Sequence, residues 1–306
     1  MAKKITLRLG GYQGADSVHT RAAVRFGEVL EREAGAHASF ELVPDVLALG
    51  RLSGDLPIMV ETGELALCYM ATVRFSPAVP ELRVFELPYV VRDRARATAA
   101  LNGSLGTLLK SEIQKNTPYR ALGFWDNGFR HFTNSVRPIR TPADCRNIRM
   151  RTQMSELQAE ALNAMGFIAI PTDIKEYVEQ IATDRFQAQE NPLTNTFNFN
   201  VHRYHRYITL SGHLFGASAF ICSQAQYGQW PREVQQAVEL AAREATAHQH
   251  ALAAAEDEEI LAKLDPKQNE LIRLTAAEHE AFVKAVEPVL QKHRNSLDPK
   301  LFQYLG

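Results

Sequence analysis

The sequence has 306 residues, of which 45% are hydrophobic and 23% are charged, and its formal net charge is −1. A chain of this length and composition can bury substantial cores and is expected to divide into two lobes. Lysine and arginine are scattered along the whole length, so no basic face of the kind that phosphate backbones require is expected, which argues against nucleic-acid binding.

The three cysteines, Cys68, Cys145 and Cys222, are far apart in the sequence and lie in or beside apolar stretches. This pattern indicates isolated buried thiols, and it fits neither a disulfide framework nor a zinc site. No apolar run approaches the length needed to span a bilayer. The composition is therefore that of an ordinary globular protein.

The first part of the chain alternates strands with helices. Residues 5–12 alternate as a strand does, and apolar residues at helical spacing follow the N-cap candidate Ser17 up to Gly35. The same pattern predicts further strands over residues 38–43, 65–70 and 119–125. It predicts further helices before Gly63 and over residues 95–101 and 105–115. This alternation favours a largely parallel sheet flanked by helices.

A second α/β set follows Trp125. Short strands are expected near residues 131–133, 148–152, 167–170, 186–189 and 204–210. Helical spacing is found over residues 155–165 and 174–182. The second set therefore has the composition of a second α/β lobe.

One long helix is expected from Pro231 to about Leu264, because this stretch is rich in Ala, Glu, Gln and Arg and contains no further Gly or Pro. At about 1.5 Å per residue it would be on the order of 45–50 Å long and would brace both lobes. No repeat or flexible linker separates the lobes, so we expect strand crossings near residues 126–128 and 212–216. The predicted lobes are discontinuous: residues 1–127 with 214–254, and residues 128–213 with 255–306.

The central third carries several motifs in a specific order. They read GFRHFTN at residues 128–134, RPIRTPAD at 137–144, IRMR at 148–151 and QENP at 189–192, and FELPY precedes them at residues 85–89. In order and spacing these segments resemble the DctP-type receptor family of tripartite ATP-independent periplasmic (TRAP) transporters. The resemblance covers essentially the whole chain.

Two departures from the family pattern stand out. Thr152-Gln153 follows Arg151 where relatives often have Val-Pro, which would alter ligand contacts. Phe186-Gln187-Ala188 precedes the QENP motif where Val-Asp-Gly is usual, which would change only the turn.

The resemblance implies an α/β, two-lobed fold like that of periplasmic binding proteins, with a cleft between the lobes. It implies transport rather than catalysis: a solute-binding protein that closes by hinge bending on a small organic carboxylate and delivers it to the TRAP membrane permease subunits. No cofactor and no metal are expected. A periplasmic location is implied, and because the chain opens with Met1-Ala2-Lys3-Lys4 just before a strand, we expect a form whose leader has been replaced by a start methionine.

Three polar residues are the central site candidates that the resemblance implies. Arg151 is expected to form a paired salt bridge with the ligand carboxylate, since a guanidinium presents parallel N–H donors and stays charged. Arg130 is expected to meet the same carboxylate or an adjacent 2-oxo or 2-hydroxy oxygen. Asn191, placed in a Gln-Glu-Asn-Pro turn, is the expected polar clamp. Glu190 is interpreted as a turn residue that bonds backbone amides.

The rest of the predicted site consists of residues at strand ends or beside the crossings, where α/β proteins place ligands. These residues are Tyr12, Met70, Ala71, Trp125, Gln153, Met154, Ile174 and Phe215. For each apolar member, packing in the core is the alternative role. Ala71 and Met154 stand where sialic-acid-binding relatives carry polar residues, so we expect a less polar ligand such as an aromatic or branched 2-oxo or 2-hydroxy acid.

An enzyme is the alternative interpretation. The glycine cluster at residues 10–14 lies between a strand and a helix, but it does not read G-x-G-x-x-G, and Glu41 lies inside the next strand instead of at its end. A nucleotide-cofactor-dependent oxidoreductase is therefore the runner-up to a receptor.

The histidines add no metal motif. His202 with His205, and His248 with His250, lack an H-E-x-x-H arrangement and are expected on the solvated surface. His213 is expected to be structural, at a crossing. A monomer is expected, with the long helix as the surface through which a dimer would form, as in some family members.

Overall fold

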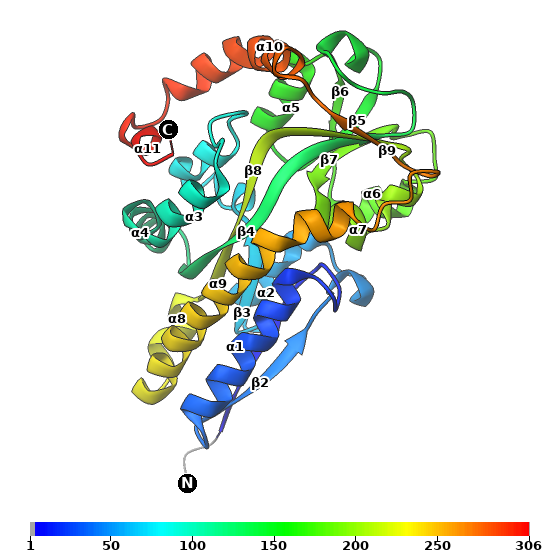
Figure 1. Cartoon of the computed structure of the whole chain (residues 1–306). Helices are drawn as coiled ribbons and strands as arrows, with labels where there is room; N and C mark the ends of the chain where they lie inside the picture. Colours follow the sequence, from blue (N-terminus) through cyan, green and yellow to red (C-terminus); the bar gives the residue numbers. More distant parts are fainter. Residues whose placement is uncertain (1–3, 306) are drawn as a thin grey trace. The chain divides into compact units, whose positions relative to one another are not determined.

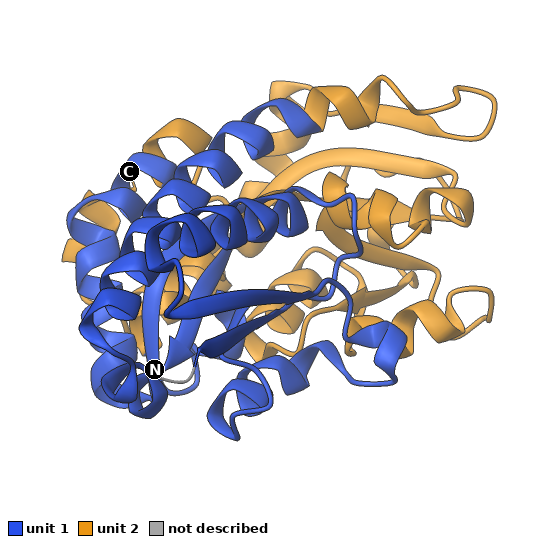
Figure 2. Cartoon of the chain, turned by 90° about the horizontal axis from the view of Figure 1, so that it is seen from below, with its two compact units in different colours: residues 1–79, 98–126, 217–256 blue, residues 80–97, 127–216, 257–306 orange. Residues whose placement is uncertain are grey.

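A computed structural model describes residues 4–305 of the chain (Figure 1). The chain groups into two compact units (Figure 2). Unit 1 contains the described residues up to 79 together with residues 98–126 and 217–256; unit 2 contains residues 80–97, 127–216 and the described residues from 257 onward. Residues 80–97, expected in the first lobe, thus group with unit 2. The boundaries of the predicted lobes stay a prediction.

Unit 1 is built on three parallel strands in the order β2-β1-β3. These strands are β1 (Ile5–Gly10), β2 (Ala38–Val43) and β3 (Leu67–Ala71). The C-terminal part of β8 (Tyr207–Ser223) pairs antiparallel with β3. The helices that lie wholly in this unit are α1 (Val18–Ala34), α2 (Leu56–Glu61), α4 (Ser104–Asn116) and α8 (Gln224–Gln229).

Helix α1 begins and ends where the sequence predicts. The Ser17 hydroxyl accepts a hydrogen bond from the Thr20 amide at 3.0 Å, and Gly35, with a φ of 54°, ends the helix. The buried face includes Phe26, Val29 and Leu30, so the helical spacing of apolar residues corresponds to the side that packs on the unit's core.

Unit 2 carries a second group of strands. The C-terminal part of β4 (Tyr119–Asn134) pairs antiparallel with β7 (Ala188–Pro192). Strand β5 (Arg149–Thr152) pairs parallel with β7 on one side and with β6 (Ile168–Pro171) on the other. Strand β9 (Glu270–Arg273) is parallel to the start of β8. The helices are α5 (Glu156–Ala164), α6 (Ile174–Gln180), α7 (Leu193–Asn198), α10 (Ala276–Arg294) and α11 (Lys300–Gln303). A core that includes Phe132, Met150, Phe167 and Phe282 holds α5 and α10 to the sheet.

Four elements contain residues of both units: β4, β8, α3 (Arg94–Asn102) and α9 (Arg232–Leu261). Strands β4 and β8 run without interruption for 16 and 17 residues, so the two separate strands predicted at 119–125 and 131–133 are one. Gly128 (φ 86°) and Gly212 (φ 53°) lie within them, at the predicted crossings, in a conformation that side chains other than glycine disfavour. Helix α9 has 30 residues and ends three residues before the predicted end.

The sheet is mixed: the pairs β1–β2, β1–β3, β5–β6, β5–β7 and β8–β9 are parallel, as a largely parallel sheet predicts, and antiparallel pairs join them. Strand β8 is antiparallel to β3, and β4 is antiparallel to β7. The alternation of strands and helices predicts parallel neighbours only where a helix connects them, and β4 and β8 meet partners that are remote in the sequence.

The prediction of isolated thiols is confirmed, since Cys68, Cys145 and Cys222 are free and buried. Within residues 4–305 no helix has both the length and the apolar character needed to cross a membrane.

Candidate ligand-binding site

Three neighbouring strands of unit 2 carry the polar residues that the sequence singles out. Arg151 of β5 lies opposite Gln189 of β7, and Arg130 of β4 lies opposite Pro192 of the same β7. Asn191 belongs to β7 itself. The three side chains are almost completely buried, with exposed fractions of 2% for Arg130, 4% for Arg151 and 2% for Asn191. The QENP segment is therefore a strand, and its prediction as a turn is wrong.

Arg151 is a buried cation that forms no salt bridge within residues 4–305. Its Nε donates to the carbonyl of Thr172 at 2.9 Å, and its guanidinium carbon lies 5.7 Å from the centre of the Tyr177 ring. Among residues 4–305, no group accepts a hydrogen bond from its two terminal nitrogens and no carboxylate forms a salt bridge with it. Burial lowers the pKa of Arg151 to about 10, so the side chain stays charged at neutral pH. A buried charge of this kind requires a counter-ion.

Arg130 has such a counter-ion. Its Nη2 donates to Glu190 Oε1 at 2.8 Å and to the Glu190 carbonyl at 2.7 Å, and its Nε bonds the second carboxylate oxygen. Burial alone would raise the pKa of Glu190, but the charge and hydrogen bonds of Arg130, with His213 close by, outweigh it, and the pKa falls below its usual value. The two residues therefore form an ion pair inside unit 2.

Glu190 is the acceptor of a larger cluster. The Thr152 hydroxyl donates to Oε1 at 2.8 Å, and His213 Nε2 lies 3.4 Å from Oε2. The interpretation of Glu190 as a turn residue that bonds backbone amides is thus wrong, because its carboxylate accepts hydrogen bonds from the side chains of Arg130 and Thr152 on two neighbouring strands. His213 is structural, as expected: it contacts this carboxylate and stacks on Phe132, with ring centres 4.5 Å apart.

Both the oxygen and the nitrogen of the Asn191 side-chain amide have hydrogen-bond partners within the protein. Its Oδ1 accepts from Arg130 Nη2 at 3.2 Å and from Asn195 Nδ2 at 3.3 Å, and its Nδ2 donates to Gln189 Oε1. An amide nitrogen carries two hydrogens, so one donor is left over after these contacts. This donor is the group through which Asn191 can act as a clamp.

The register of the strands separates the two arginines. Side chains alternate between the two faces of a sheet, and the pairing of β4, β7 and β5 puts Arg130 and Thr152 on the face of Glu190, and Arg151 on the face of Gln189 and Asn191. One face thus holds a balanced ion pair, and the other holds the unbalanced guanidinium. Near the end of β7, Arg130 reaches Asn191 and connects the two faces.

Neutral polar groups surround Arg151 on its own face. Gln189 Nε2 donates to the Thr133 hydroxyl at 3.2 Å, which bonds His205 Nδ1 at 2.8 Å. His205 Nε2 lies 3.4 Å from the Tyr177 hydroxyl. Burial lowers the pKa of His205 to about 3, so the imidazole is neutral at pH 7. The expectation that His205 lies on the solvated surface is wrong, since its exposed fraction is 2%.

The other predicted site residues of unit 2 differ in exposure. Met154 follows Arg151 by three positions and is 52% exposed, and Gln153 is partly buried and accepts a hydrogen bond from Gln158 at 3.3 Å. Ile174 and Phe215 are buried, and the Phe215 ring lies 5.5 Å from that of Phe129. Gln153 and Met154 are therefore the accessible neighbours of Arg151 in the sequence.

The four remaining candidates lie in unit 1. Tyr12 forms an isolated bridge with Asp45, and Met70 and Ala71 end β3. Trp125 is fully buried, its Nε1 donates to the Thr246 hydroxyl at 3.1 Å, and its ring stacks on Phe220. These contacts give Trp125 a packing role in unit 1. Ligand contact for these four residues stays a prediction.

Sequence reasoning did not single out Glu190, Thr152 or Tyr177 as site residues. Tyr177 could have been found from the sequence, because Glu176-Tyr177 is one of the segments that resemble the family pattern, on the helix that follows β6. The roles of Glu190 and Thr152 depend on strand register, which no local pattern reports. In the described part of the chain, no group of three His, Cys, Asp or Glu side chains is arranged to hold a metal ion.

A comparison with known protein families identifies the family of this chain. A family model described as bacterial extracellular solute-binding protein, family 7 (DctP), matches residues 9–296. The chain belongs to this family. The predicted resemblance to DctP-type receptors is confirmed, and the chain is a solute-binding transport protein and not an enzyme. The oxidoreductase alternative has no support.

Several curated relatives match nearly the whole chain. The protein y4mM of Sinorhizobium fredii, itself uncharacterized, is 29% identical over 95% of this chain and 52% of its own length, so the chain spans about half of that relative. The 2,3-diketo-L-gulonate-binding periplasmic protein YiaO of Escherichia coli is 27% identical over 90% of this chain and 83% of its own length. The C4-dicarboxylate-binding periplasmic protein DctP of Rhodobacter capsulatus is 25% identical, with coverages of 94% and 86%.

Solved structures confirm the predicted fold class. The sugar acid binding protein DctPAm from Advenella mimigardefordensis, in complex with galactonate, superposes with a TM-score of 0.93 at 22% identity and covers 99% of this chain and 97% of its own. A TRAP periplasmic solute-binding protein from Shewanella oneidensis with bound succinate has a TM-score of 0.92 at 20% identity, with coverages of 99% and 98%. At these identities the likeness shows the fold alone.

Proposed function

We propose that this protein is the extracytoplasmic solute receptor of a TRAP transporter and that Arg151 binds the carboxylate of its solute. The observation that carries the proposal is the contrast between two buried arginines. Arg130 forms a salt bridge with Glu190, whereas Arg151 forms no salt bridge among the described residues. A solute carboxylate would supply that salt-bridge partner.

Hydrogen bonds to a charged group contribute about 1.5–3 kcal/mol each. Two parallel bonds from the guanidinium fork to one carboxylate would therefore dominate the affinity for a small ligand. A neutral solute would leave the charge of Arg151 buried and unbalanced. Selection of an acid over its neutral analogue follows from this one residue.

Arg130 and Asn191 complete the proposed polar group. We place Asn191 beside the same carboxylate or an adjacent 2-oxo or 2-hydroxy oxygen, because its remaining Nδ2 hydrogen lies on the face of Arg151. Arg130 was expected to meet the carboxylate directly. In view of its ion pair with Glu190, we propose that its main contribution is to orient Asn191.

The ligand class is proposed from the chemistry of Arg151 and its neighbours. Solved relatives hold organic acids: succinate, galactonate, D-erythronate and (S)-2-acetolactate in four cases. In this chain the exposed Met154 lies close in sequence to Arg151, and Ala71 offers no hydroxyl. These residues favour a monocarboxylate with an apolar body, such as an aromatic or branched 2-oxo or 2-hydroxy acid.

Location and partners follow from the family. Relatives such as YiaO and DctP are named periplasmic proteins, and we propose the same location for this chain. The receptor would close on its solute by hinge bending and present it to the membrane permease subunits as a monomer. Closure and the monomeric state are tested by small-angle scattering with and without ligand.

Titration calorimetry with a panel of acids tests the proposed function. The panel contains phenylpyruvate, 2-oxoisovalerate, succinate and glucuronate, each against wild type and Arg151→Gln. We expect at least one 2-oxo acid to bind wild type and to lose about 100-fold in affinity in the variant. Arg149→Gln is the matched control, because Arg149 precedes Arg151 on β5 by two residues and bonds the carbonyl of Arg185 at 3.1 Å. Native affinity in Arg151→Gln would refute the assignment, and tight binding of glucuronate alone would refute the ligand class.

A further inference from the structure

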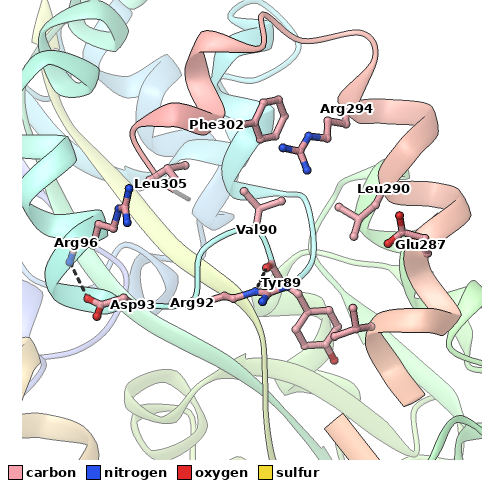
Figure 3. A pocket seen from close by; sticks show the side chains of 11 residues that line it. Tyr89, Val90, Arg92, Asp93, Arg96, Glu287, Leu290, Arg294, Phe302 and Leu305 are labelled. Atoms are coloured by element: carbon pink, nitrogen blue, oxygen red, sulfur yellow. Dashed lines mark hydrogen bonds between the residues drawn. The ribbon is translucent and has the colours of Figure 1, made fainter. Parts of the chain in front are cut away.

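Unit 2 contains a pocket of 380 Å³ that shares no residue with the proposed site of Arg151 (Figure 3). It is formed by residues 89–96, which continue the FELPY motif, and by helices α10 and α11 with the residues that follow them. Its volume falls in the range of about 300–1,000 Å³ that small-molecule sites occupy. The pocket is therefore large enough for an organic molecule of modest size.

Five residues give the pocket apolar walls. They are formed by Val90 from the first segment, Val283 and Leu290 from α10, and Phe302 and Leu305 near the end of the described chain. Aliphatic and aromatic groups from three segments thus face one space, and they would bury the hydrocarbon part of a ligand.

Three arginines also line the pocket: Arg92, Arg96 and Arg294. None of them forms a salt bridge with a carboxylate in residues 4–305. Arg92 Nε donates to the carbonyl of Tyr89 at 3.2 Å, which leaves its terminal nitrogens available. The guanidinium of Arg294 lies 4.3 Å from the centre of the Phe302 ring, which holds the cation against the apolar wall. Figure 3 shows Arg294 pointing into the space between Phe302 and Val90.

Two carboxylates of the lining are already engaged by neutral groups. Asp93 accepts a hydrogen bond from the Arg96 amide at 2.8 Å, and Glu287 accepts one from Gln291 Nε2 at 2.8 Å. Three guanidinium groups against two carboxylates leave one net positive charge in the lining. This balance favours a ligand with a single negative charge, because a second anionic group would meet Asp93 or Glu287.

We infer that this pocket is a second binding site, which takes an organic monoanion with an extended apolar body, such as a medium-chain carboxylate. The carboxylate meets Arg92 and Arg294 at the rim, and the chain lies among Val90, Leu290 and Phe302. Hydrogen bonds from a guanidinium to a carboxylate are the strong, charge-assisted kind. The site is independent of the solute site, since none of these residues belongs to the cluster of Arg151.

Octanoate is the probe, and the full chain with Arg151→Gln is the background, because that substitution removes the proposed solute contact. Calorimetry should show saturable binding of octanoate in wild type and in Arg151→Gln alike. Arg294→Gln and Arg92→Gln should each weaken it by about tenfold. Arg232→Gln, at an exposed position of α9, is the control and should bind as wild type does. Octanamide, which has the same chain without the charge, should bind about tenfold more weakly than octanoate.

Four results would overturn the inference. Loss of octanoate binding in Arg151→Gln would place the probe at the solute site, and equal binding of octanamide would show that the pocket selects no anion. Octanoate binding that persists in the double variant Arg92→Gln/Arg294→Gln would remove these residues from the site. If octanoate does not bind, and the double variant no longer supports transport when it is combined with the membrane subunits, the surface around this pocket docks a protein and not a small acid. Melting temperatures of the variants verify that each is folded.

Discussion

Arg130 and Glu190 face each other across two strands of unit 2, with Nη2 and Oε1 2.8 Å apart and with exposed fractions of 2% and 0% for their side chains. This pair accounts for one of the two arginines that the sequence assigns to the ligand. It also makes the two arginines experimentally distinguishable, because one has an internal counter-ion and the other does not.

Replacement of Glu190 by Gln should destabilise the protein. The guanidinium of Arg130 would remain buried without its anion, and breaking a buried ion pair on one side costs about 3–5 kcal/mol. Urea unfolding followed by circular dichroism measures the change. Thr152→Val, which removes a single hydrogen bond to the same carboxylate, should cost only about 1 kcal/mol. Equal free energies of unfolding for wild type and Glu190→Gln would mean that the Arg130–Glu190 ion pair does not stabilise the fold.

Arg130→Gln and Arg151→Gln should have different effects on the melting temperature of the ligand-free protein. The first variant leaves Glu190 unbalanced and should lower the melting temperature. The second removes a buried cation that lacks a partner and should leave the melting temperature unchanged or raise it. Differential scanning calorimetry separates the two outcomes. A large loss of stability in Arg151→Gln would show that this arginine has a structural role in the absence of ligand.

Ligand affinity should be independent of pH between about 6 and 8, because the pKa of Arg151, which burial lowers to about 10, stays well above this range and the guanidinium remains charged. Arg151→Lys keeps a positive charge but loses the planar fork, so it should bind about tenfold more weakly at pH 7. Calorimetric titrations at several pH values test both statements, and a marked change in affinity near pH 6.5 would point to a histidine instead.

Stability should decrease as the pH falls from about 6.5 to about 3. Burial lowers the pKa of His131 and of His205 to about 3, whereas in the unfolded chain a histidine titrates near 6.5. The unfolded state therefore binds protons first, and the stability present above pH 6.5 is lost as the pH falls toward the folded pKa. Urea midpoints at pH 7.5 and 5 measure the effect. His205→Asn should flatten the dependence, and substitution of the exposed His248 should not.

The three polar candidates could be predicted from sequence because they belong to ordered motifs. Arg130, Arg151 and Asn191 lie on three strands that pair side by side, although a turn was expected for Asn191. Helix α1 and most strands were predictable because caps and apolar spacing are local signals. The limits of α9 were accurate to within three residues for the same reason.

Other features depend on contacts that no local pattern contains. The continuity of β4 and β8 rests on two glycines that keep an extended strand going at positive φ, where glycine usually indicates an interruption. The ion pair of Glu190 and the burial of His205 depend on which strands become neighbours. Helices α10 and α11, which supply part of the lining of the second pocket, lie in the segment after residue 264, for which the sequence patterns led to no prediction.

The neutralised pair of Arg130 and Glu190 has a bearing on which solutes the receptor accepts. With that pair internally satisfied, the site offers a single elementary charge, that of Arg151, to an incoming molecule. A solute with one carboxylate would complete electroneutrality, whereas a dianion would bring in surplus negative charge for which these strands supply no compensating cation. If Arg151 binds the solute as proposed, the charge of the transported acid, and not only its shape, would be selected by an ion pair that the solute does not contact.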